Sequence, residues 1–139
     1  MKKSILLLAF IVSACISKNE PSINTSIING HWEIVKVETP NDKNKTYNIN
    51  TFVDFFKLNT NNKGFRQKLK VDFSGNYSGN NIQENITIHK EKKDYIITYK
   101  TSLSTWTEKI LKLTDKELIL QHNNGINYHY KKHDKLNIK

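Results

Sequence analysis

The chain has 139 residues, of which 37% are hydrophobic and 25% are charged, and its formal net charge is +9. This length accommodates one small domain and excludes a multidomain enzyme. The single cysteine excludes intramolecular disulfides and any zinc site that needs two thiolates.

The beginning of the chain has the pattern of a signal peptide. Met1, Lys2 and Lys3 form a basic start, and residues 5–12 form an unbroken apolar run. In a helix this run would span about 12 Å, far short of the ~30 Å hydrocarbon core of a membrane. We therefore predict a cleaved signal over residues 1–14 and not a membrane span.

Residues 12–15, Val-Ser-Ala-Cys, resemble the lipobox of bacterial lipoproteins, an aliphatic residue and two small residues before a cysteine. The resemblance implies that Cys15 becomes the N-terminus and carries acyl chains such as palmitate, which anchor the protein in a membrane. The alternative is an ordinary secretory signal with a chance cysteine. Residues 16–20 contain one acid, Glu20, whereas an acidic cluster directs some lipoproteins to the cell surface. The expected location is the bacterial cell envelope, at the outer membrane, with the periplasmic face favoured.

After the cysteine, residues 15–29 are rich in Ser and Asn, contain Pro21 and show no period, which predicts a flexible tether. A domain is expected over residues 30–139, where strand-like patterns follow one another. Residues 51–58 fit either a strand or a short helix. Residues 106–113 also fit helical spacing, through Trp106, Ile110 and Leu113, although strands are favoured there. The other expected strands are residues 31–38, with a local irregularity, 68–73, 85–90, 95–101, 117–122 and 126–132.

Turn signals separate these strands at short intervals. They lie at residues 74–76, 91–94, 114–116 and 123–125, and the last contains Asn-Gly, the strongest short hairpin signal. Short connections join antiparallel neighbours. The pattern therefore predicts an all-β fold, either an antiparallel barrel or a sandwich.

Three stretches resemble lipocalins and the small lipocalin-like domains of bacterial lipoproteins. Residues 30–34 resemble the Gly-x-Trp opening, residues 69–77 a strand that ends in a glycine turn before an aromatic residue, and residues 110–130 the closing strands. The resemblance implies an up-and-down barrel of about eight strands, in which Gly30 and Trp32 close one end. In such barrels a cation from the last strand often stacks on the Trp. Here that strand offers Lys131 and Lys132 but no arginine, so we expect a weaker or differently built closure.

Neither metal binding nor catalysis has a convincing motif. If residues 124–125 form a two-residue turn, His122 and His129 lie diagonally on one face, but no third ligand is near, and His89 and His133 lie elsewhere. Solvated surface histidines are the favoured interpretation. The sequence lacks a Gly-x-Ser-x-Gly elbow, a His-Glu-x-x-His motif and a phosphate loop. We expect no metal, no cofactor and no enzymatic activity.

Two functions remain open. The first is a membrane-anchored barrel that binds a small apolar or amphipathic ligand, with Phe73, Tyr95, Tyr99 and Trp106 as the expected inward-facing contacts. The alternative is a protein-interaction module of the envelope, an assembly subunit or an inhibitor, with a filled barrel. Nucleic-acid binding is not expected, because the lysines are scattered and Arg66 is the single arginine. The basic tail at residues 131–139 suits anionic headgroups, although a solubilising surface is the simpler interpretation.

Overall fold

The computed structural model describes residues 22–134. Within this range the chain forms one 3-10 helix and ten strands. In chain order they are η1 (Thr25–Ile28), β1 (Gly30–Glu38), β2 (Lys45–Thr46), β3 (Phe52–Leu58), β4 (Lys63–Val71), β5 (Tyr77–Ser78), β6 (Glu84–Glu91), β7 (Asp94–Lys100), β8 (Thr105–Leu113), β9 (Glu117–His122) and β10 (Asn127–Lys132).

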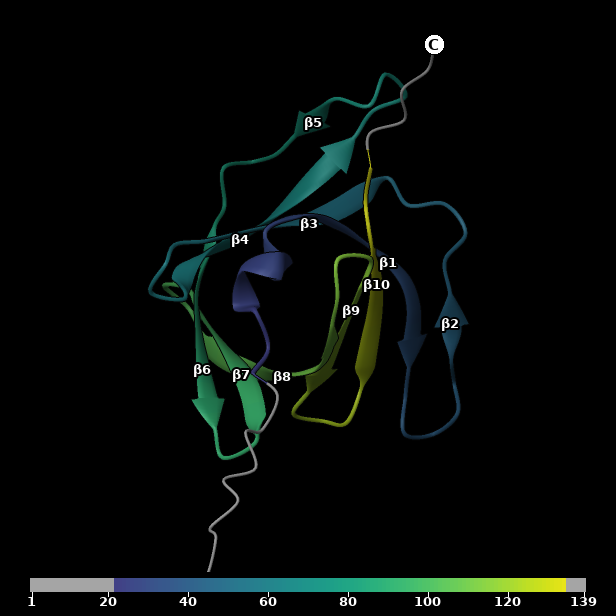
Figure 1. Ribbon diagram of the computed structural model, residues 1–139. Coiled ribbons are helices and arrows are strands. Elements are labelled where there is room, and N and C mark those ends of the chain that lie inside the picture. The colour runs from purple at the N-terminus through teal and green to yellow at the C-terminus, as the bar shows by residue number, and fades with distance from the viewer. Residues whose placement is uncertain (1–21, 135–139) are drawn as a thin grey trace, which may run out of the picture.

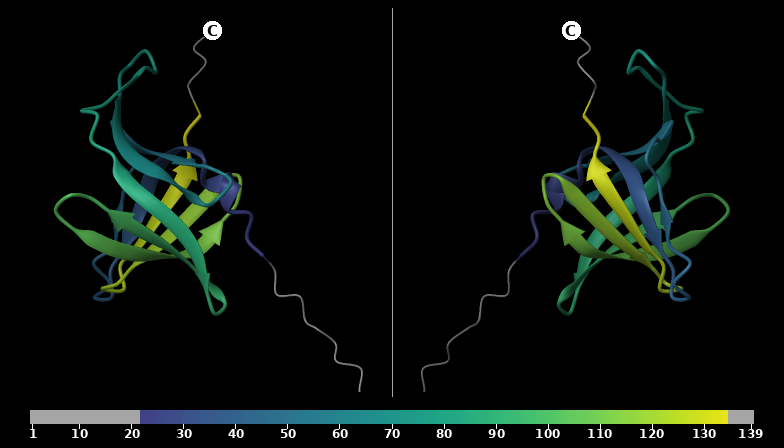
Figure 2. Two further views of the ribbon diagram at one scale, coloured as in Figure 1. Left: turned by 90° about the vertical axis from the view of Figure 1, so that its left-hand side faces the viewer. Right: turned by 90° about the vertical axis from the view of Figure 1, so that its right-hand side faces the viewer.

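Eight of the strands close into one antiparallel barrel. They are hydrogen-bonded in the order β10-β9-β8-β7-β6-β4-β3-β1, and β1 also pairs with β10, which closes the ring (Figures 1 and 2). The two-residue strands β2 and β5 lie outside this ring, where they pair with β1 and β4. Closure removes the unpaired edges that an open sheet would expose. The predicted all-β barrel of about eight strands is confirmed.

The two ambiguous segments are both strands. Residues 52–58 form β3, and residues 105–113 form β8, so the helical alternative for residues 106–113 is wrong. The pairing of β8 with β9 shifts between Ile110 and Lys112, which marks a bulge. A bulge inserts one extra residue and changes which side chains face inward. It explains why Trp106, Ile110 and Leu113 have helix-like spacing although they lie on a strand.

The irregularity expected in the first strand is a bulge as well. The pairing of β1 with β10 shifts between Ile34 and Lys36. Trp32 pairs with Lys132 before the shift, and Val37 pairs with Tyr128 after it.

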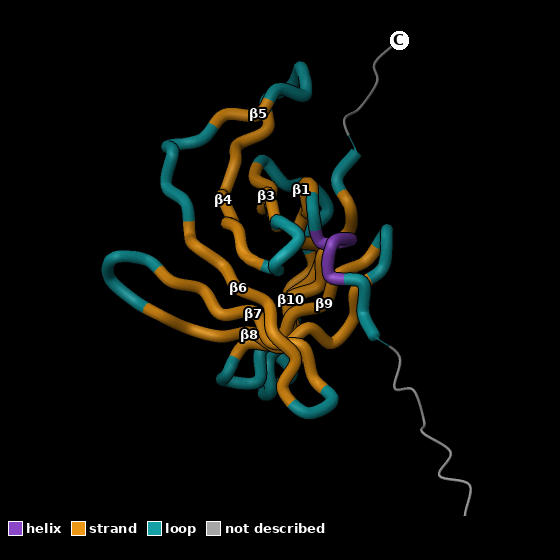
Figure 3. The backbone as a smooth tube through the Cα atoms, turned by 60° about the vertical axis from the view of Figure 1, so that its left-hand side comes forward, coloured by secondary structure: helices purple, strands orange, loops and turns teal. Residues whose placement is uncertain are grey.

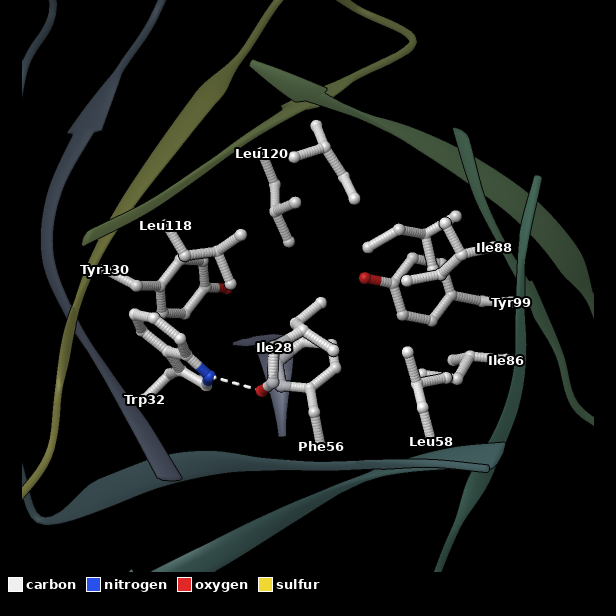
Figure 4. Close-up of a cluster of buried hydrophobic side chains, with 12 residues drawn as sticks. Ile28, Trp32, Phe56, Leu58, Ile86, Ile88, Tyr99, Leu118, Leu120 and Tyr130 are labelled. Carbon is white, nitrogen blue, oxygen red and sulfur yellow. Dashed lines mark hydrogen bonds between the residues drawn. The ribbon is translucent and has the colours of Figure 1, made fainter. Parts of the chain in front are cut away.

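An apolar cluster fills part of the barrel, and η1 contributes to it from within (Figure 4). The Ile28 side chain is 0% exposed, and the indole Nε1 of Trp32 donates a hydrogen bond of 2.6 Å to the Ile28 carbonyl. The buried cluster consists of Ile28, Trp32, Phe56, Leu58, Ile86, Ile88, Ile97, Tyr99, Ile110, Leu118, Leu120 and Tyr130.

This packing corrects the C-terminal limit of the predicted tether. The expectation of a flexible segment up to residue 29 is wrong for residues 25–28, which form η1 and bury Ile28. Just before η1, the Ile23 amide donates to the Tyr95 hydroxyl at 3.2 Å. Residues 15–21 lie outside the described residues. Within residues 22–134, no helix is long and apolar enough to cross a membrane.

The second half of β4 continues into a hairpin that stands away from the barrel (Figure 3). The Asp72 carboxylate accepts hydrogen bonds from the amides of Ser74 and Asn76, at 2.9 and 2.8 Å, and thereby fixes the turn predicted at residues 74–76. The side chain of Phe73, at the tip of this turn, is fully exposed.

Candidate functional site

The closed end of the barrel is built on Gly30, Trp32 and Lys132. Gly30 has a φ of +117°, and a Cβ added there would lie 3.1 Å from the Lys132 side chain, so both the backbone angle and the space favour glycine. The Lys132 Nζ lies 4.3 Å from the centre of the Trp32 ring system. It also donates to the carbonyls of Ile27, at 3.2 Å, and Asn29, at 2.5 Å.

Lysine therefore supplies the cation at this end of the barrel. The ammonium lies over the indole and binds two carbonyls next to η1, which a point charge with three donors can do. Burial lowers the pKa of Lys132 below its ordinary value. The hydrogen bonds thus join β10 to the η1 segment in addition to the cation–π contact.

A cavity of about 520 Å³ lies next to the apolar cluster, and Trp32 and Tyr130 belong both to its wall and to that cluster. Its size falls within the usual range for small-molecule sites. Side chains from six barrel strands and from the segment before β3 form the wall. The lining residues are Trp32, Ile34, Ile49, Asn50, Thr51, Phe52, Asp54, Arg66, Lys68, Trp106, Glu108, His122, Tyr128 and Tyr130.

Two ion pairs occupy the β3–β4 side of the cavity. The Arg66 Nε lies 2.5 Å from a Glu84 carboxylate oxygen, and the guanidinium lies 4.4 Å from the centre of the Tyr99 ring. The Lys68 Nζ lies 3.0 Å from a carboxylate oxygen of the buried Asp54. Both cations come from alternate positions of β4 and face the carboxylates of neighbouring strands.

Glu108, on β8, is the buried carboxylate with an unmet hydrogen-bonding capacity. The residue is 6% exposed, and within residues 22–134 its Oε2 makes no hydrogen bond of ordinary geometry, although the Tyr99 hydroxyl is a neighbouring donor. The nearest cations stand beyond hydrogen-bond distance: Arg66 Nη1 lies 4.0 Å from Oε2, and His122 Nδ1 lies 3.7 Å from Oε1. A buried carboxylate whose hydrogen bonds are poorly formed is costly.

Aromatic rings line the remaining wall. The rings of Tyr99 and Trp106 are stacked, with centroids 5.1 Å apart and planes 6° from parallel. Burial raises the pKa of the Tyr99 phenol well above its ordinary value, so this hydroxyl keeps its proton. The neighbouring acceptor is the Glu108 carboxylate, which raises the pKa of the phenol further. The cavity wall therefore combines flat apolar surface with a buried carboxylate.

The four aromatic residues expected to face a ligand lie in three different places. Trp106 lines the cavity, and Tyr99 lies behind it in the core. Tyr95 packs near the N-terminal segment, where its hydroxyl accepts from Ile23. The expectation that Phe73 points inward is wrong, because β4 ends at Val71 and Phe73 lies in the exposed turn.

The two histidines expected on one face lie on opposite faces. The β9–β10 turn has three residues and not two, because the Gly125 amide bonds to the His122 carbonyl at 2.9 Å, with Gly125 at a φ of +82°. His129 consequently pairs with Ile119, faces outward and contacts Glu38 at 2.9 Å, whereas His122 lines the cavity. Within residues 22–134, no group of three or more His, Cys, Asp or Glu could hold a metal ion.

Comparisons with known proteins show the fold. No family model matches the sequence, and the comparison with curated proteins gives no match. A lipocalin-like protein from Bacteroides uniformis superposes with a TM-score of 0.51 at 12% identity, over 77% of this chain and 99% of that one. An uncharacterized protein from Bacteroides eggerthii superposes with a TM-score of 0.50 at 18% identity, over 76% and 98%. The chain thus has a lipocalin-like barrel fold.

Proposed function

We propose that this protein binds a small amphipathic molecule inside the barrel and releases it unchanged. The observation that carries the proposal is the cavity of about 520 Å³. Small eight-stranded barrels can be filled by side chains or can hold one small ligand. Here Trp106 and Tyr128 offer apolar surface, while Glu108 offers a buried polar group that orients a ligand.

Binding is tested with a neutral fluorescent probe such as N-phenyl-1-naphthylamine. A chain that begins at Ile16 keeps every described element of the barrel and has neither the predicted signal nor Cys15. We expect saturable probe binding that weakens about tenfold or more in Trp106→Ala, because a large part of the cavity wall is lost. Phe73→Ala is the matched control, since it removes an exposed aromatic ring outside the cavity. Absence of saturable binding, or an equal loss in both variants, would overturn the proposal.

We also propose that the barrel is held in the bacterial envelope by acyl chains on Cys15. The support is the lipobox-like sequence at residues 12–15, which directly follows the apolar run. Two or more acyl chains anchor a protein stably, whereas one chain binds only marginally. Cys15→Ser should move the protein from the membrane fraction to the soluble fraction, and mass spectrometry of the parent chain should find an acylated N-terminal cysteine. Unchanged fractionation together with an unmodified cysteine would contradict the anchor.

A second candidate function, recognition of another protein, is favoured by a groove outside the barrel. The groove measures about 660 Å³, and its lining includes Ile49, Val71 and Phe73. The Ile49 side chain is 87% exposed, and Phe73 is fully exposed. Exposed apolar groups gathered at a groove are typical of interaction sites. Cross-linking in intact cells should give a stoichiometric partner that Phe73→Asp loses and Leu103→Asp, a control at another exposed apolar position, keeps.

A further inference from the structure

The charges around the cavity differ in sign from those of the whole chain. The protein has a formal net charge of +9. The carboxylates of Asp54, Glu84 and Glu108 nevertheless meet the cations of Arg66 and Lys68 here, which leaves one formal negative charge in excess when His122, 3.7 Å from Glu108, is counted as neutral. A lysine-rich chain has thus placed an acidic cluster inside its barrel.

The two cations of this cluster are already engaged by acidic side chains. Arg66 is held by Glu84 and by the face of the Tyr99 ring, and Lys68 is held by Asp54. An anionic ligand head would have to displace one of these carboxylates, and it would meet Glu108 close by. Like charges at short range repel each other. The arrangement therefore disfavours a carboxylate or phosphate head.

The acceptor at Glu108 has the opposite preference. The Glu108 carboxylate lines the cavity, its neighbouring donor is the neutral Tyr99 hydroxyl, and its nearest cationic groups, Arg66 Nη1 and His122 Nδ1, stand 4.0 and 3.7 Å away. A charged donor of a ligand would bind it at about 2.7–2.9 Å and would restore the balance of charge. Trp106 and Tyr128 line the same cavity, and aromatic faces attract cations as well as apolar chains.

We propose that the ligand is an amphipathic amine whose protonated head binds Glu108 and whose apolar body packs against Trp106 and Tyr128. The inference rests on the proposed function, because it names the class of molecule that the cavity takes. It also assigns a role to Glu108 as the residue that determines specificity.

Three probes of one chain length test the head group: decylamine, decanol and decanoate, each used to displace N-phenyl-1-naphthylamine at neutral pH. In the parent chain, decylamine should displace the dye at a concentration at least about tenfold lower than decanoate, the factor expected of one charge-assisted hydrogen bond. Glu108→Gln keeps the size of the side chain and removes its charge. It should abolish most of this preference while changing decanol displacement less than about threefold.

The matched control is Glu91→Gln, which removes one negative charge from an exposed position at the end of β6. It should keep the preference for the amine. Dye binding by Glu108→Gln shows that its cavity is intact, so a lost preference is not a loss of folding. Equal displacement by decylamine and decanoate, or a preference that survives Glu108→Gln, would overturn the inference and leave the binding function standing. Failure of the dye and of all three probes to bind would overturn the proposed function as well.

Discussion

Truncation of Ile28 to alanine tests whether η1 is part of the folded barrel or merely precedes it. The side chain is completely buried in the apolar cluster, although it belongs to a segment that reads as a linker in the sequence. Its carbonyl also holds the indole of Trp32. Because alanine keeps this carbonyl, the substitution isolates the contribution of the side chain.

The expected loss follows from what is removed. Ile28→Ala deletes three buried carbon atoms, each worth about 0.8 kcal/mol of transfer free energy, or about 2.4 kcal/mol together. The cavity left behind adds to this cost, and buried Ile→Ala substitutions fall at about 2–5 kcal/mol. We expect a decrease of about 3 kcal/mol in the free energy of unfolding. For a domain of this size the decrease corresponds to a lower Tm by roughly 12 °C.

Urea unfolding followed by tryptophan fluorescence measures this loss directly, since Trp32 lies in the same cluster. Ile49→Ala is the matched control, because it deletes the same atoms from a side chain that is 87% exposed. Surface substitutions of this kind stay within about 0.5 kcal/mol. If Ile28→Ala were as mild as Ile49→Ala, η1 would not belong to the core, and the closed end of the barrel would need another explanation.

Three further predictions concern charge, backbone space and the closed end. The Lys36 ammonium holds the pKa of Glu38 at about 2, so Glu38→Gln should lower stability above pH 4.5, and the deficit should disappear as the pH falls towards 2. A Cβ on Gly64 would lie 1.8 Å from the Lys57 carbonyl oxygen, so Gly64→Ala should cost about 3 kcal/mol in urea unfolding. Lys132→Met should cost about 1–3 kcal/mol, because two carbonyls lose a donor and the indole loses its cation.

The sign of the first prediction follows from proton binding. Between about pH 2 and 4.5 the unfolded chain binds more protons at Glu38 than the folded chain does. A deficit in Glu38→Gln that grew on acidification would contradict this. For the closed end, Lys132→Arg is the control, because a guanidinium can still stack and donate. A Gly64→Ala variant as stable as its parent would mean that β3 and β4 do not approach as closely as described.

Much of the barrel was predictable because its turns are short and local. The turn at residues 91–94 aligns Glu91 with Asp94, and the Asp72 carboxylate organises the turn after β4. Such signals depend on a few neighbouring residues, so they can be recognised in the sequence. The closed end was partly predictable for the same reason, since Gly30 and Trp32 are two residues apart. Lys132, which contacts Trp32, lies about 100 residues later in the sequence, so no local pattern links the two residues.

The inward face of each strand was harder to predict, because a period of two does not say which set of side chains is buried. In β4 the strict alternation at residues 68–71 suggests that Leu69 points into the barrel. In fact Lys68 lines the cavity, and a Cβ on Gly79 of the outer hairpin would lie 2.8 Å from Leu69. One extra residue in the β9–β10 turn likewise moved His129 to the outside.

Glu108 shows where a signal for the site was nevertheless present. The burial of Trp106 and Ile110 requires the residue between them in the same phase, Glu108, to face inward too. On a helix with this spacing, Glu108 would not have to face the core. The helical spacing fits residues 106–113 only because the bulge before Lys112 changes which side chains of β8 face inward. Once β8 is recognised as a strand, an acidic residue stands at an inward position of a barrel. A buried charge needs a partner or a ligand, so the residue that interrupts the apolar pattern of β8 is the one that points to the binding chemistry.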